Sequence, residues 1–194
     1  MRVPAFLLIL LTAAGAGGCA GPPAPLQNAP APAERSSDGA ITLSGGGEFT
    51  ASDTGTGTGA IAYDRRLAPK GSQASLTTES TGNKTRTSLV VEGLLPRRHY
   101  GAHLHAKACG KKPDDSGPHY QHHAGQINPD SEVWLDVTTN DDGAGRSTAR
   151  HDWALDPAKL PGSLVIHAQP TKTSGPQVGT AGARIACLTL KKSS

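Results

Sequence analysis

The chain has 194 residues, of which 18% are charged and 4% are aromatic, with 24 glycines and 15 prolines. This composition disfavours a helix bundle and suits short β-strands joined by turns. The net charge of +3 is small and dispersed along the chain, so we expect no nucleic-acid partner.

The first residues have the pattern of an export signal. Arg2 precedes the apolar run Ala5–Ala14, which is too short to span a bilayer, and small residues then lead to Cys19. This order is similar to a bacterial lipoprotein cleavage site, although Ala16 stands where leucine is usual. We expect a signal peptide over residues 1–19 and a lipid on Cys19 that attaches the protein to the extracytoplasmic side of a membrane in the cell envelope. An ordinary cleaved signal is the alternative.

Residues 20–38 separate this signal from the rest of the chain. They are rich in proline and alanine without apolar periodicity, which predicts a disordered tether. A folded domain is expected over residues 39–194. If Cys19 carries a lipid, two cysteines remain, and disulfides persist in exported proteins. We therefore predict a bond between Cys109 and Cys187.

From about residue 40 the pattern is that of short β-strands. Thr81-Gly82-Asn83-Lys84 lies between two alternating segments and is a hairpin signal. Further strands are predicted at 101–105, 133–138, 146–153, 163–167 and 183–190. Short strands at this spacing predict an antiparallel sandwich or barrel. The irregular stretches 106–132 and 168–182 are functional candidates, because long loops are otherwise uncommon.

The eight histidines are unevenly distributed. His103 and His105 are two residues apart in a predicted strand, so both imidazoles share one face and can bind one metal. Imidazole suits copper and zinc. His119 follows Gly-Pro in the long loop, and His167 ends a predicted strand. His99 and His151 are expected to have no ligand role, and His151 is expected to face water.

Five segments resemble, in the same order, the signature segments of Cu,Zn superoxide dismutases. They are Gly93–Pro96, Gly101–His105, Gly117–Tyr120, Leu164–His167 and Gly179–Cys187. The resemblance covers about residues 40–190. It implies an eight-stranded antiparallel Greek-key β-barrel or sandwich. It also implies an enzyme that converts superoxide to oxygen and hydrogen peroxide by cycling copper between Cu(II) and Cu(I).

The resemblance implies roles for individual residues. His103, His105 and His167 match three copper ligands. His119 matches the fourth ligand, which in the family bridges copper to zinc, and it is the candidate to carry a proton. Arg184 matches the arginine that attracts superoxide. In the family, the positions of Cys109 and Cys187 form the intrasubunit disulfide, in agreement with the cysteine count.

The zinc half of the family's site is not recognisable. The Gly-Asp-Leu motif is absent, Ala168–Thr171 stands where the family has an aspartate after its last copper ligand, and the following loop is shortened. One interpretation is a protein that binds copper only, which we favour because the adjacent His122 and His123 lie at a loop tip. The other is a replacement zinc site built from His122, His123, Asp130 or Glu132.

Two other functions remain open. A copper-binding protein that holds or delivers copper with little turnover is the main alternative, and a scaffold without metal is the third, since a fold alone does not imply a function. The sequence indicates neither an oligomeric state nor which membrane would carry the lipid.

Overall fold

The computed structural model describes residues 39–51 and 59–193. The expected signal peptide, the tether and Cys19 lie outside the described residues. Within those residues, no helix is long and apolar enough to cross a membrane.

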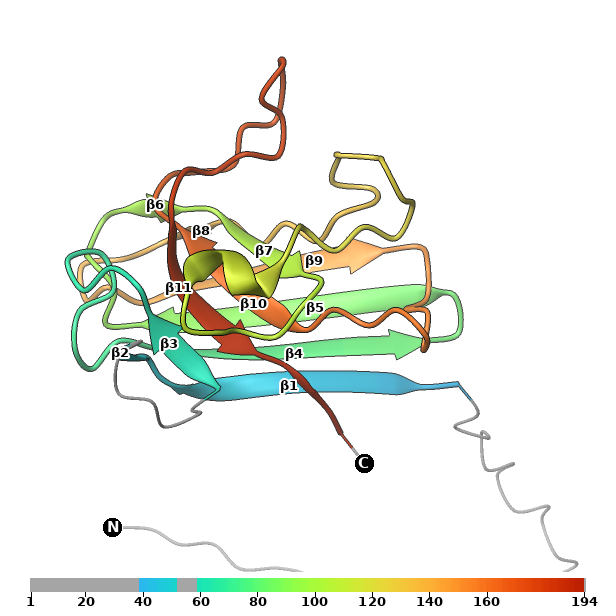
Figure 1. Cartoon of the computed structure of the whole chain (residues 1–194), viewed down its shortest axis with the longest axis horizontal. Helices are drawn as coiled ribbons and strands as arrows, with labels where there is room; N and C mark the ends of the chain where they lie inside the picture. Colours follow the sequence, from blue (N-terminus) through green and yellow to red (C-terminus); the bar gives the residue numbers. More distant parts are fainter. Residues whose placement is uncertain (1–38, 52–58, 194) are drawn as a thin grey trace, which may run out of the picture. The chain divides into compact units, whose positions relative to one another are not determined.

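The described residues are almost entirely β-structure, which confirms the predicted all-β class (Figure 1). Within residues 39–51 and 59–193, eight of the twelve strands have three or more residues, and one short 3-10 helix, η1, lies in the first long loop. The elements are β1 (Ile41–Glu48), β2 (Thr50–Ala51), β3 (Ala60–Ala62), β4 (Gln73–Thr81), β5 (Lys84–Glu92), β6 (His99–Tyr100), β7 (Ala102–His105), η1 (Pro113–Ser116), β8 (Val137–Thr138), β9 (Gly145–His151), β10 (Ser163–His167), β11 (Arg184–Thr189) and β12 (Lys191–Lys192).

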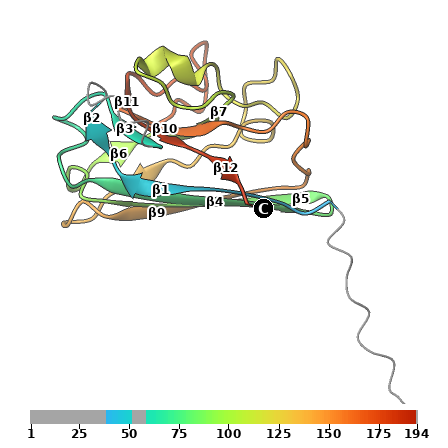
Figure 2. The same cartoon turned by 60° about the horizontal axis from the view of Figure 1, so that its bottom comes forward.

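The strands form two layers. One five-stranded sheet has the order β12-β1-β4-β5-β9, the other has the order β2-β3-β11-β10-β7, and β6 pairs with β8 separately. All pairs are antiparallel except β2 with β3. Figure 2 shows the first sheet as one layer with the second sheet above it. Since many neighbouring strands are not consecutive in the sequence, the chain crosses repeatedly between layers, as in sandwiches.

The predicted hairpin is confirmed as β4 and β5. Buried and exposed residues alternate strictly along β4, so one face of the strand packs into the core and the other meets solvent. Leu76 of β4 lies opposite Leu89 of β5, and both are buried. Gly82 in the connecting turn has φ of 59°, a conformation that glycine adopts without strain.

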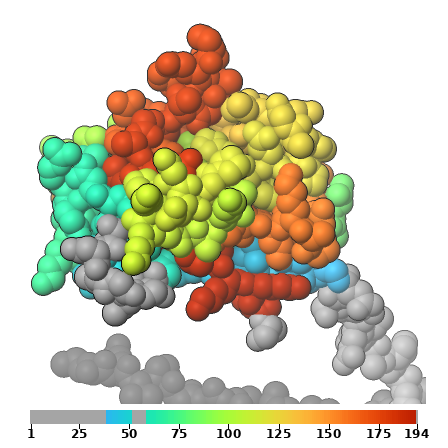
Figure 3. All heavy atoms as spheres, viewed as in Figure 1, coloured from blue at the N-terminus to red at the C-terminus, as the bar shows by residue number. Residues whose placement is uncertain are grey.

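The second sheet differs because it is buried on both faces. Every residue of β7 and β10 is buried, including His103 and His105. Their inner faces meet the first sheet, and the long loops cover their outer faces. In Figure 1 the loop that contains η1 crosses in front of β10. In the same view in Figure 3 this loop forms part of the surface that faces the reader. Polar side chains on β7 are therefore enclosed beneath the loops.

The first long loop is tied to the second sheet by a covalent bond. Cys109 in the loop and Cys187 of β11 form the predicted disulfide, which joins residues 78 positions apart. The backbone N–H of Cys109 also donates to Thr189 Oγ1 at 3.2 Å. The loop therefore has a fixed end next to the strand that carries Arg184.

One predicted strand is only partly formed. Only Val137–Thr138 of the segment 133–138 is a strand, and residue 134 makes an isolated bridge to His103. The segment still pairs loosely with β7, because Leu104 N–H donates to Val133 O and Leu135 N–H donates to Ala102 O. The side chains of this segment still alternate between its two faces although regular strand pairing is missing. This alternation directs Trp134 toward the histidines, and its ring centroid lies 6.1 Å from that of His103.

Candidate metal centre

Four histidines from three parts of the chain converge beneath the loops. Two come from β7, one from the first long loop and one from the end of β10: His103, His105, His119 and His167. Each offers a ring nitrogen within 4.8 Å of those of the others. No other group of three or more metal-ligating side chains occurs in the described residues. The period of two along β7 and the pairing of β7 with β10 create this arrangement.

The protons of His105 and His167 are fixed by the backbone. His105 Nδ1–H donates to Gly117 O at 2.9 Å, and His167 Nδ1–H donates to Gly182 O at 3.1 Å. The Nε2 atoms of both rings are buried and have no hydrogen-bond partner. A buried acceptor without a partner is costly, and an imidazole nitrogen with a free lone pair is a metal ligand. These two rings therefore fit a bound metal ion.

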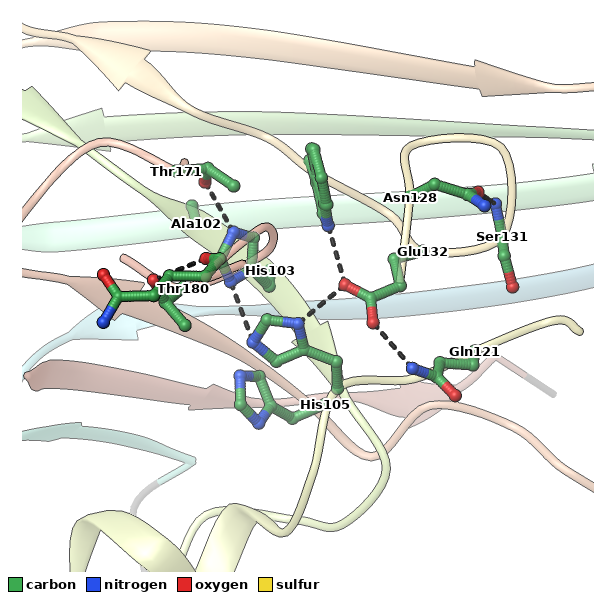
Figure 4. Close-up of polar contacts among 12 residues, drawn as sticks. Ala102, His103, His105, Gln121, Asn128, Ser131, Glu132, Thr171 and Thr180 are labelled. Carbon is green, nitrogen blue, oxygen red and sulfur yellow. Dashed lines mark hydrogen bonds and ion pairs between the residues drawn. The ribbon is translucent and has the colours of Figure 1, made fainter. Parts of the chain in front are cut away.

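His103 is oriented by a threonine and an aspartate. Thr171 Oγ1 donates to Asp136 Oδ1. The same oxygen lies 2.6 Å from His103 Nε2, a contact drawn in Figure 4. Because the hydroxyl proton is already given to the carboxylate, the threonine oxygen accepts from His103 Nε2–H. The lone pair of His103 is then on Nδ1, which lies 3.1 Å from His119 Nε2.

His119 is oriented by a buried carboxylate. His119 Nδ1–H donates to Glu132 Oε2 at 2.7 Å, which leaves the lone pair of His119 on Nε2. His119 Nε2 and His103 Nδ1 therefore face each other as two acceptors, an arrangement that repels unless a cation lies nearby. The donor set thus fits a cation that imidazoles bind, such as copper or zinc.

Burial keeps the ring nitrogens unprotonated. Desolvation lowers the pKa of His105 to about 3 and that of His167 to about 4, although each Nδ1–H bond to a backbone carbonyl opposes the shift. Desolvation likewise places the pKa of His103 far below its ordinary range. At neutral pH these three rings are uncharged, which is the form that binds metals.

Glu132 is the carboxylate that contacts His119 directly. Its side chain is buried, and it accepts from His119 Nδ1, from Trp134 Nε1 at 2.8 Å and from Gln121 Nε2 at 2.8 Å (Figure 4). Burial alone would raise the pKa of Glu132, but these three donated hydrogen bonds outweigh it and lower the pKa. Glu132 is therefore a charged group held against His119.

The other candidates for a zinc site lie elsewhere. The ring of His122 stacks flat on Trp153, with centroids 4.4 Å apart and planes at 4°. The ring of His123 lies 4.6 Å from that of His122 on the exposed loop, and Asp130 is exposed. None of the three belongs to a group of three or more ligands within the described residues. Beside His119 Nδ1 lies the carboxylate of Glu132.

Arg184 lies at the start of β11 against the first long loop. Its Nη1 donates to Pro113 O at 3.1 Å and to Ser116 Oγ at 2.9 Å, and its side chain is 21% exposed. Its positive charge is one of the smaller causes that lower the pKa values of His105 and His167. The arginine is therefore anchored by η1 with its charge acting on the cluster.

The sequence interpretation did not find the partners of the ligands. Glu132 was considered only as a zinc ligand, and Trp134, Asp136 and Thr171 were given no role. A signal was present, since residues 132, 134 and 136 alternate with three buried apolar residues and so share one face. That face carries the two carboxylates and the indole that act on the histidines.

Comparison with known proteins agrees with this geometry. The family model for copper/zinc superoxide dismutase (SODC) matches residues 71–189, a span that contains the four histidines, both bonded cysteines and Arg184. No curated protein gives a significant match to the chain. Because the matched span covers more than half of the chain and encloses the whole histidine cluster, the chain belongs to the copper/zinc superoxide dismutase family.

Proposed function

We propose that the protein is an extracytoplasmic superoxide dismutase that holds copper with four histidines, which are His103, His105, His119 and His167. The observation that carries the proposal is the set of four ring nitrogens within 4.8 Å of one another, two of them buried without a partner. Copper bound by neutral imidazoles supplies the one-electron redox chemistry that conversion of superoxide to oxygen and peroxide requires.

In this proposal His119 is the proton carrier. Its side chain is 20% exposed, whereas His103, His105 and His167 are buried, so His119 is the ring of the four that solvent reaches. A proton taken up at Nε2 would make an imidazolium whose Nδ1–H already points at charged Glu132. The carboxylate stabilises that cation, which makes His119 a suitable general acid for the peroxide product.

Arg184 is the proposed attraction point for the substrate. Superoxide is a small anion, and a partly exposed guanidinium near the cluster raises its local concentration. The hydrogen bonds from Arg184 to Pro113 and Ser116 fix where that charge lies.

We propose that copper works here without zinc. Glu132 supports this, because it already supplies an acceptor for His119 Nδ1, the ring nitrogen that is not directed at the other histidines. His122, His123 and Asp130 lie in a loop, and the ring of His122 packs on Trp153. A carboxylate bound to Nδ1 orients the imidazole, as outer partners of metal ligands generally do.

Export and membrane attachment remain part of the proposal. The signal-like residues 1–19, the tether 20–38 and a lipid on Cys19 would place the domain at 39–194 outside the cytoplasm. The disulfide between Cys109 and Cys187 supports this compartment, because such bonds persist in oxidising surroundings.

The test is metal content combined with superoxide dismutation. The purified protein is stripped of metal and reloaded with copper alone, with zinc alone, or with both. We expect one copper per chain, rapid dismutation with copper alone and no gain from zinc. Stoichiometric copper with negligible turnover would instead favour a copper-handling protein. One tightly held zinc per chain, lost on His122→Ala, would contradict the copper-only assignment.

A further inference from the structure

The backbone around Glu132 is held by His151, the last residue of β9, and by Trp153, which follows the strand. His151 Nε2 lies 3.0 Å from Pro129 O and 3.1 Å from Glu132 O. Two residues later, Trp153 Nε1–H donates to Asp130 O at 2.7 Å. Carbonyl oxygens only accept, so His151 Nε2 carries the proton and donates to both.

His151 does not face water as expected from the alternating pattern. Its Nδ1 atom is buried and has no hydrogen-bond partner, and its ring lies 4.4 Å from that of Trp153. Its Nε2 is directed at the loop backbone instead of at solvent. A single tautomer, with the proton on Nε2, satisfies this arrangement.

Trp153 also contacts the first part of the segment 121–132, which contains His122, whereas His151 contacts its last part. The ring of His122 stacks on Trp153 at 4.4 Å, and His122 N–H donates to Ser131 O at 2.8 Å. Both arms of the segment 121–132 therefore rest on one group of rings at the end of β9. The loop that carries Glu132 has a fixed position although it contains no strand.

We propose that His151 is a positioning residue for the metal centre. By donating to the carbonyls of Pro129 and Glu132, it fixes where the Glu132 carboxylate meets His119 Nδ1 and Trp134 Nε1. The inference deepens the proposed function, and its expected effect on the dismutation rate rests on that function. Its expected effect on the position of the Glu132 carboxylate does not depend on any activity.

The structural consequence can be read from the indole of Trp134. The chain has two tryptophans, so each indole N–H gives its own NMR signal in the full-length, metal-free protein. His151→Phe removes the donor and keeps a flat ring against Trp153. We expect the Trp134 indole N–H to exchange with solvent about tenfold faster, because its acceptor on Glu132 is no longer held.

Two further variants separate donation from packing. The amide nitrogen of His151→Gln reaches the position of Nε2 and should restore slow exchange, whereas that of His151→Asn is too short and should not. His99→Phe is the matched control, since His99 is an exposed strand histidine whose hydrogen bond is to Thr138 and not to the segment 121–132. It should leave the Trp134 signal unchanged.

Copper-loaded proteins give the second readout. His151→Phe and His151→Asn should bind one copper and lose about tenfold in dismutation rate, and His151→Gln should retain it. Unchanged exchange at Trp134 in a folded His151→Phe protein would overturn the inference. If that variant does not fold, equal behaviour of the Gln and Asn variants overturns it. A wild-type protein that binds copper without dismutation would refute the proposed function and leave the Trp134 comparison decisive for His151.

Discussion

The position of each proton decides what the four histidines can do. Backbone carbonyls hold Nδ1–H on His105 and His167, whereas side-chain acceptors hold Nε2–H on His103 and Nδ1–H on His119. The lone pairs are therefore directed into the cluster before any metal binds. Such preorganisation lowers the cost of binding an ion that needs neutral imidazoles.

Glu132 is the residue whose charge we expect to matter most for turnover. Glu132→Gln keeps the size of the side chain and an acceptor oxygen, but it cannot stabilise a protonated His119 and presents an amide donor to Trp134 or Gln121. We expect copper content to stay at one per chain and the dismutation rate to fall by about tenfold or more.

The control for this variant is Glu79→Gln, which removes an exposed carboxylate that lies 3.8 Å from Arg86. Rates are measured by pulse radiolysis or stopped flow on copper-loaded protein. Equal rates for the two variants would show that the charge on Glu132 is not used.

The elements differ in how far the sequence alone predicts them. The hairpin of β4 and β5 follows from the alternation of apolar and polar residues in two neighbouring segments and from Gly82 in the turn between them. It was therefore predictable from one short stretch of sequence. The segment 133–138 alternates just as clearly, yet only Val137–Thr138 forms a strand, which pairs with β6, while residue 134 makes an isolated bridge to β7. Its pairing therefore depends on partners far earlier in the chain. A local pattern predicts which side chains share one face of a strand, whereas distant segments decide whether that strand forms regular backbone hydrogen bonds.

The same limit applies to the candidate site. The histidines were identified because the family resemblance marks them. The disulfide was predicted because two cysteines remain when Cys19 is assigned to the lipid, and the resemblance implies the same pair. The contact of Glu132 with His119 depends on the path of a loop held by His151 and Trp153. No spacing rule predicts such a path, so the carboxylate that serves His119 could not be distinguished from a zinc ligand.

At the scale of elements, the disulfide connects the first long loop to the second sheet. We expect the double variant Cys109→Ser, Cys187→Ser to lose about 4 kcal/mol of unfolding free energy, because the bond closes a long loop in the unfolded chain. Denaturant titration measures the loss. The wild type in reductant should match the double variant, and an unchanged midpoint in both would contradict the prediction.

The whole molecule encloses a cluster of neutral imidazoles, and this makes the stability of the metal-free protein depend on pH. An unfolded histidine titrates near 6.5, whereas burial lowers the pKa of His105 to about 3 and that of His167 to about 4. Between these values the unfolded chain binds more protons than the folded chain. Stability is therefore full above pH 6.5 and falls as the pH drops toward 4.

We expect this loss to reach about 3 kcal/mol for His167 alone by pH 4, from the difference between its two pKa values. Thermal unfolding of the metal-free protein at pH 7, 5.5 and 4 measures it. His167→Gln should have a shallower dependence of stability on pH over the same interval, because one titrating ring is gone.

Copper at a fixed concentration should raise the unfolding midpoint most at pH 7 and progressively less toward pH 4, since protons compete with the ion for the same nitrogens. A midpoint that is flat from pH 7 to 4 without metal would mean that the cluster opens to solvent in the free protein, and the enclosed centre described here would then form only when the ion binds.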